Sequence, residues 1–186
     1  MAPEKPSVSP SDEETPGPVS TAVCLGERPY NPDSAPYAGK GPHPMTIIHY
    51  DSGPATLELQ YVTLPDGWDP EVDFDWSDEE EDHNKVQLVV CDDAVATGGV
   101  IGTCEFDYPG MSGSMDVVQA DHTFVVREAR TGREVADFRM QGTAGAEESC
   151  PSSAMDSGNT QIAQAVNDDA VAAKLRSLYE GPARKS

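Results

Sequence analysis

The stretch HTFVVREARTGREVADFRM constrains the fold more than any other part of the chain. Apolar and polar side chains alternate on both sides of Arg130-Thr131-Gly132, and alternation with a period of two indicates β-strands. A three-residue loop with Gly132 in the left-handed conformation would join these strands as an antiparallel hairpin. A two-residue loop would instead set apolar side chains opposite charged ones. The hairpin register predicts these apolar pairs: Phe124 with Phe138, and Val126 with Ala136.

Four more segments have the alternation or the β-branched, apolar content of strands. MTIIHY and TLELQYV are expected to form another hairpin around a turn at residues 51–54. VQLVVC and VIGTCEFDY are expected to be two separate strands, with AVATGG as the tight connection between them. If those two strands pair, Cys91 and Cys104 could face each other across the ladder.

The end of the chain, NDDAVAAKLRSLYE, is typical of an amphipathic helix. Asn167 or Asp168 can cap its start, and three apolar residues recur at helical spacing: Val171, Leu175 and Leu178. Together with the strands, this predicts a mainly β fold. We expect an antiparallel β-sandwich or open barrel of about five to seven strands, closed by one C-terminal helix.

The chain divides into a tail and one domain. Residues 1–20 are rich in Pro, Ser and acidic residues and have too little apolar surface to offset the entropy of ordering, so we expect a disordered tail or linker. Residues 21–186 are expected to form a single disulfide-stapled β domain with an acidic loop at 66–84. Its first part is irregular in composition and is expected to be held down by Tyr30, Tyr37 and Cys24.

The net charge of -21 excludes several partners. A field of that sign repels nucleic acid phosphates and anionic membrane surfaces, so direct nucleic-acid binding is not expected. Mimicry of DNA is disfavoured because the carboxylates are concentrated in one stretch rather than spread along the chain. No apolar run is long enough to span a bilayer, and the N-terminus lacks the pattern of a signal peptide.

The chain has four cysteines: Cys24, Cys91, Cys104 and Cys150. They form no CxxC motif and no cluster at zinc-binding spacing, which favours two disulfides in an oxidising compartment. Three pairings are possible, and we predict Cys91 with Cys104 and Cys24 with Cys150. Four reduced cysteines in a cytosolic core are the alternative. The disulfide interpretation predicts an extracellular or cell-surface location, with the signal or anchor absent from this chain.

The stretch DFDWSDEEEDH contains the candidate metal site, Asp73, Asp75 and Asp78. Asp73, Asp75 and Ser77 match the first three ligand positions of an EF-hand loop. The match then fails, because Asp78 stands where the loop needs glycine and Asn84 where it needs a bidentate glutamate. Calcium binding outside an EF-hand stays open, against the alternative of a solvated acidic loop with no cofactor.

Trp76 is the residue that a solvated loop explains least. A tryptophan among so many charges either packs back on the domain or is exposed for a partner. We therefore take Trp76 as a candidate partner-binding residue.

No pattern in the sequence predicts catalysis. GMSGS resembles a nucleophile elbow, but Ser114 occupies the position of its second glycine. TGGVIGT lacks the lysine of a phosphate-binding loop. The four histidines, His43, His49, His83 and His122, are far apart in sequence, and no triad is singled out. We interpret His43 as structural and His49 as partly buried.

The order of these pieces resembles a small uncharacterised domain of actinobacterial secreted or membrane-anchored proteins. The resemblance covers about residues 22–180 and is carried by Cys24, YAGKGPHP, LPDGW, VQLVVC, Cys104, REARTGREV and Cys150-Pro151. It implies an extracytoplasmic domain with paired cysteines on a Pro/Ser/acidic linker, and it implies no activity. The chain departs from it in the acidic insertion between Trp68 and Lys85.

The leading hypothesis is an extracytoplasmic, non-catalytic module that binds a protein or a cell-envelope component as a monomer. One alternative is a calcium-binding or calcium-stabilised domain. The other is a secreted enzyme or enzyme inhibitor, for which the loop at Cys150-Pro151 would present a rigid site.

Overall fold

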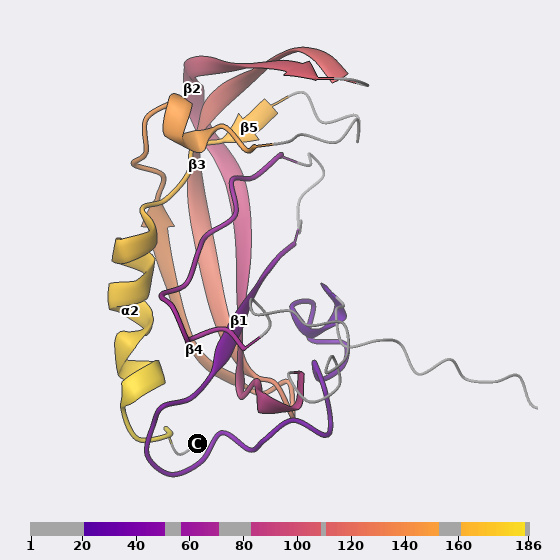
Figure 1. Cartoon of the computed structure of the whole chain (residues 1–186), viewed down its shortest axis with the longest axis vertical. Coiled ribbons are helices and arrows are strands. Elements are labelled where there is room, and N and C mark those ends of the chain that lie inside the picture. The colour runs from indigo at the N-terminus through magenta and orange to yellow at the C-terminus, as the bar shows by residue number, and fades with distance from the viewer. Residues whose placement is uncertain (1–20, 51–56, 71–82, 109–110, 153–160, 185–186) are drawn as a thin grey trace, which may run out of the picture.

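A computed structural model describes residues 21–50, 57–70, 83–108, 111–152 and 161–184. Here five strands form one sheet in the order β1-β2-β3-β4, with β5 beside β3 (Figure 1). The elements are η1 (Thr21–Val23), β1 (Met45–His49), β2 (Leu88–Tyr108), β3 (Met111–Glu128), β4 (Glu134–Gln141), η2 (Glu147–Ser149), β5 (Gln161–Ala163) and α2 (Asp168–Glu180). The expected mainly β fold with one C-terminal helix is confirmed. The strands form one open sheet rather than the two sheets of a sandwich, and the sheet is mixed rather than antiparallel, because β1 pairs with β2 and β5 with β3 in parallel.

The hairpin of β3 and β4 has the register that its sequence predicts. Phe124 pairs with Phe138 and Val126 with Ala136, and the two phenylalanine rings stack at 4.8 Å. Gly132 has a φ of 73°, which only glycine adopts without strain. The local pattern therefore determines this part of the sheet.

Helix α2 also begins and packs as expected. Asn167 is the N-cap, and its side-chain oxygen accepts a hydrogen bond of 3.0 Å from the backbone N–H of Ala170. Val171, Leu175 and Leu178 are buried against the sheet. No helix in the described part of the chain is long and apolar enough to cross a membrane.

The expected hairpin of MTIIHY and TLELQYV is wrong. Residues 45–49 form β1, but β1 runs parallel to β2. Residues 57–62 make only an isolated bridge, from Glu58 to Ile162. The apolar alternation is satisfied differently, because Leu57 and Leu59 pack on the face of the sheet against residues such as Ala94 instead of entering a ladder.

The expected division between VQLVVC and VIGTCEFDY is also wrong. Both belong to β2, a strand of 21 residues. The glycine-containing stretch between them is a bulge, where the register with β3 shifts between Ala96 and Val100 and again between Val100 and Gly102. Such bulges bend a ladder. Figure 1 shows the end of the β2–β3 hairpin folded over, and we call this part, residues 100–108 and 111–118, the arm.

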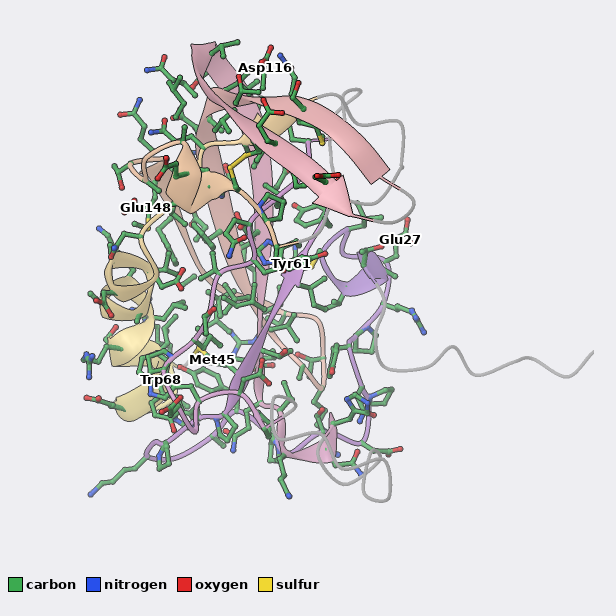
Figure 2. The ribbon with its side chains drawn as sticks, turned by 45° about the horizontal axis from the view of Figure 1, so that its top comes forward. Glu27, Met45, Tyr61, Trp68, Asp116 and Glu148 are labelled. Carbon is green, nitrogen blue, oxygen red and sulfur yellow. A yellow bond between two sulfur atoms is a disulfide. The ribbon has the colours of Figure 1, made fainter. Side chains whose placement is uncertain are left out.

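Both faces of the sheet are covered. On one face, Met45, Leu88 and Phe124 pack with α2, and Trp68 stacks on Tyr179 with 4.2 Å between the ring centroids. Figure 2 shows Trp68 beside α2. The opposite face is covered by the N-terminal segment through Val23, Cys24 and Tyr30. Tyr30, Tyr37 and Cys24 are all buried, as expected for residues that hold an irregular segment on a domain.

The two disulfides exist, but the predicted pairing is wrong. Cys24 pairs with Cys91, and Cys104 with Cys150, at Cα separations of 5.5 and 5.6 Å. Cys91 and Cys104 cannot face each other because they lie on the same strand, where their partners across the ladder are Val125 and Met115. One disulfide fixes the N-terminal segment to β2, and the other fixes the segment after η2 to the arm.

Gly102 allows the η2 segment to pack closely on the bend. A Cβ at Gly102 would lie 2.3 Å from Cβ of Ala146, whereas a Cβ at Gly99 would meet nothing within 4 Å. We expect Gly102→Ala to lower the free energy of unfolding by about 1–3 kcal/mol through overpacking. Gly99→Ala, the matched control, should change it by less than about 1 kcal/mol. Urea unfolding measures both, and equal effects would contradict this account of the bend.

Candidate functional site

The residues proposed from the acidic stretch, Asp73, Asp75, Asp78 and Trp76, lie outside the described residues. Calcium binding at the three aspartates and the burial of Trp76 stay predictions. Within the described ranges, no group of three or more His, Cys, Asp or Glu side chains is arranged to hold a metal ion.

The two flanks of the acidic stretch are each held to the domain by a backbone hydrogen bond. Before it, Trp68 is buried beside α2, and its carbonyl accepts a hydrogen bond of 2.9 Å from the N–H of Met45. After it, the carbonyl of Asn84 accepts a 2.8 Å hydrogen bond from the N–H of Ala35, in the N-terminal segment.

A buried polar cluster joins three neighbouring strands, β1, β2 and β3, on the α2 side of the sheet. It consists of His49 from β1, Asp92 from β2 and His122 from β3. Nδ1 of His122 lies 3.0 Å from Oδ1 of Asp92, and its Nε2 lies 3.0 Å from the carbonyl oxygen of Gln164. Asp92 and His122 are almost completely buried. Strand alternation explains the grouping, since Asp92 follows Leu88 and Val90 on one face and His122 precedes Phe124 and Val126.

The hydrogen bonds of His122 define its charge. Both of its neighbours, a carboxylate and a carbonyl, accept hydrogen bonds, so His122 satisfies both only when both ring nitrogens carry protons. Burial acts to lower the pKa of His122, but the hydrogen bond and charge of Asp92 outweigh it, and the pKa is raised above 6.5. Burial acts to raise the pKa of Asp92, but His122 and His49 outweigh it, and that pKa is lowered.

His49 is the more accessible member of the cluster. Its Nδ1 lies 3.0 Å from Oδ2 of Asp92, but it is not aligned for a hydrogen bond, so we treat the pair as an electrostatic contact. The ring of His49 packs against Tyr61 at 4.9 Å, and Tyr61 is 68% exposed. Among the described residues, the cluster therefore comes nearest to the surface at this end.

The chemistry of these residues favours a structural role for the cluster. His122 uses both ring nitrogens internally and has none left for a substrate.

All four cysteines are in disulfides, so none supplies a thiolate. Ser112 and Ser114 lie in strand β3 of the arm, so the strand-to-helix turn of a nucleophile elbow is not formed there. The surface turn that the Gly/Ser composition of this stretch indicates is not formed at these residues either. His43 is structural as expected, since it is buried and bonded to Gln87 and Gly181.

The second notable feature is the outer edge of β2. β1 pairs with β2 only as far as Asp92. From Ala94 to Glu105, the described residues provide no strand on the side away from β3. Val95, Val100 and Ile101 lie along this edge and are 53%, 56% and 37% exposed. An exposed edge strand with apolar side chains is a surface to which another polypeptide can add as a strand.

The sequence contained a signal for the cluster but not for the edge. Asp92 and His122 stand in phase with core residues of their strands, which marks them as buried polar groups that need partners. The open edge depends on where β1 ends and on the continuity of β2.

The chain matches no protein family, no curated protein and no solved structure in the comparisons made.

The Asp92–His122 pair should make stability depend on pH. A raised folded-state pKa of His122 means that its stabilising contribution is complete below about pH 6.5 and is lost as the pH rises through that raised value. Asp92 acts in the opposite sense, because its contribution is lost as the pH falls through its lowered pKa. We therefore expect the stability due to this pair to decline above neutral pH.

The variant Asp92→Asn tests this origin. Removing one partner of a buried ion pair should lower the free energy of unfolding by roughly 3 kcal/mol near pH 6. With the anion gone, burial lowers the pKa of His122, so the decline above neutral pH should disappear. Urea unfolding of both proteins between pH 5 and 9 measures this, and an unchanged alkaline slope in the variant would refute the assignment.

Proposed function

We propose that the chain is an extracytoplasmic, non-catalytic module that binds another protein through the open edge of β2. The observation that carries this proposal is the strand edge from Ala94 to Glu105, with its exposed Val95, Val100 and Ile101. Main-chain groups on such an edge supply affinity, and the side chains beside them supply selectivity.

The concentration of apolar surface supports this choice of site. The described residues contain five exposed large hydrophobic side chains, and three of them fall between Val95 and Ile101. Single exposed apolar residues are common on any protein, but a group on an unpaired strand is an association surface. The other two of these five exposed side chains, Leu25 and Tyr61, lie outside the edge.

The scaffold suits binding because β2 is fixed on both sides of the edge. Cys91, just before the open edge, is bonded to Cys24. Cys104, near the end of that edge, is bonded to Cys150. A binding edge that is already rigid loses less entropy when a partner docks. Disulfides form and persist in oxidising compartments, and this supports the extracytoplasmic part of the proposal together with the resemblance to secreted and anchored domains.

Selection from a random peptide display library tests the binding site. We expect selected peptides to bind the full chain and to shift backbone amide resonances of residues 94–105. Val95→Glu should weaken binding at least about tenfold, because a buried charge replaces an apolar contact. Leu25→Glu is the matched control, since both side chains are 53% exposed, and it should leave binding unchanged. Peptides that map elsewhere, or equal losses in both variants, would refute the proposed site.

The compartment is tested by counting thiols. Protein isolated from its native source without reductant and then denatured should show no thiol that reacts with a maleimide or Ellman reagent, because both disulfides would be formed. Reduction before denaturation should then expose all four cysteines, which controls for accessibility. Four reactive thiols in the unreduced sample would overturn the extracytoplasmic assignment.

A further inference from the structure

We infer that the occupant of the β2 edge is an extended, basic segment of another protein, which adds to the sheet as a strand beside residues 94–105. This inference rests on the proposed function, because it specifies the chemistry of the partner at the same edge. It excludes a second copy of this chain as the occupant.

The charge of the edge and its surroundings points to the sign of the partner. From Asp93 to Asp121, the chain has five acidic residues and no Lys, Arg or His: Asp93, Glu105, Asp107, Asp116 and Asp121. All except Asp93 are exposed. Figure 2 shows Asp116 on the arm, where it lies across the ladder from Thr103. An interface forms readily where the two potentials are complementary, so this surface favours cations.

The pleat of the arm separates its charged face from its apolar one. From Gly102 onward β2 pairs with β3 without further register shifts. Thr103, Glu105 and Asp107 are exposed, while Cys104 and Phe106 between them are buried. A strand added alongside would therefore set alternate side chains beside the acidic face. Lys or Arg at those alternate positions would make cross-strand ion pairs.

The same charges oppose pairing of two identical edges. A dimer formed through β2 would be isologous, so acidic residues of one copy would approach those of the other. No lysine, arginine or histidine of the arm could offset them, and each chain carries a net charge of -21. Like charges opposite one another in a ladder destabilise it. The acidic residues thus act against self-association while leaving the edge open to a basic chain.

The bulge sets where the partner's apolar side chains are needed. Val100 and Ile101 lie within the bulged stretch, and Val95 lies just before it. A segment that combines basic residues along the arm with apolar residues near the bulge would match both features. The required ligand is therefore amphipathic and extended, in contrast to a folded basic surface.

A synthetic peptide of about ten residues that alternates Lys with Val tests this inference on the full chain by isothermal calorimetry. We expect binding that weakens as salt is raised, since exposed ion pairs are screened. A peptide with Glu in place of Lys should show no binding. A peptide with proline at two central positions should bind weakly, because proline removes the N–H that a ladder needs.

Two charge-matched variants locate the acidic contribution. The triple variant Glu105→Gln, Asp107→Asn, Asp116→Asn should raise the Kd of the Lys/Val peptide by roughly tenfold. The control triple variant Glu27→Gln, Asp33→Asn, Asp66→Asn removes three exposed charges outside the arm and should change the Kd less than about twofold. Equal effects would show that only the overall charge matters and would overturn the inference.

The outcomes separate this inference from the proposed function. If display-selected peptides map to residues 94–105 but are not basic and ignore the arm triple variant, the inference fails and the proposed function stands. If no peptide maps to that edge, both fail. Sedimentation of the protein without peptide tests whether a second copy occupies the edge. A dimer that the Val95→Glu substitution dissociates would identify a second copy as the occupant and overturn the inference.

Discussion

The continuity of β2 is the constraint on which the other elements depend. Its first residues pair with β1 on one side and with β3 on the other, so they form the centre of the sheet. Its later residues pair with β3 alone and bend away after the bulge. Both disulfides attach to it, one to the central part and one to the bent part. The N-terminal segment, the arm and the segment before β5 are therefore all positioned by one strand.

Local patterns predicted the parts of the fold that local interactions determine. The β3–β4 hairpin follows from alternation around Gly132, and α2 follows from a cap at Asn167 and apolar residues at helical spacing. The stretch Ala94–Gly99 misled the prediction, because glycines between two apolar runs suit a turn and a bulge equally well. A turn at this stretch would place Cys91 and Cys104 on two paired strands, opposite each other. The wrong prediction of a Cys91–Cys104 disulfide follows from that turn.

The candidate site could be predicted only in part, for a related reason. Asp92 and His122 are recognisable as core-facing polar residues, but their contact depends on the register between β2 and β3, which brings together two residues that are 30 apart in sequence. The carbonyl of Gln164, which accepts a hydrogen bond from His122, belongs to the backbone before α2. No residue pattern in the sequence specifies the position of that carbonyl. Among the described residues the edge of β2 is open because β1 stops at His49, a property of the neighbouring strand rather than of β2.

The anchored flanks of the acidic stretch have a consequence for how this protein can change over evolutionary time. Trp68 and Asn84 are each fixed by contacts with residues outside the stretch that joins them. Lengthening a connection costs little additional closure entropy when its ends are already fixed. The number of residues between Trp68 and Asn84 can therefore vary among descendants of this chain while the sheet, the helix and the disulfides keep their places. New sequence, or an inserted reporter domain, is best accommodated there.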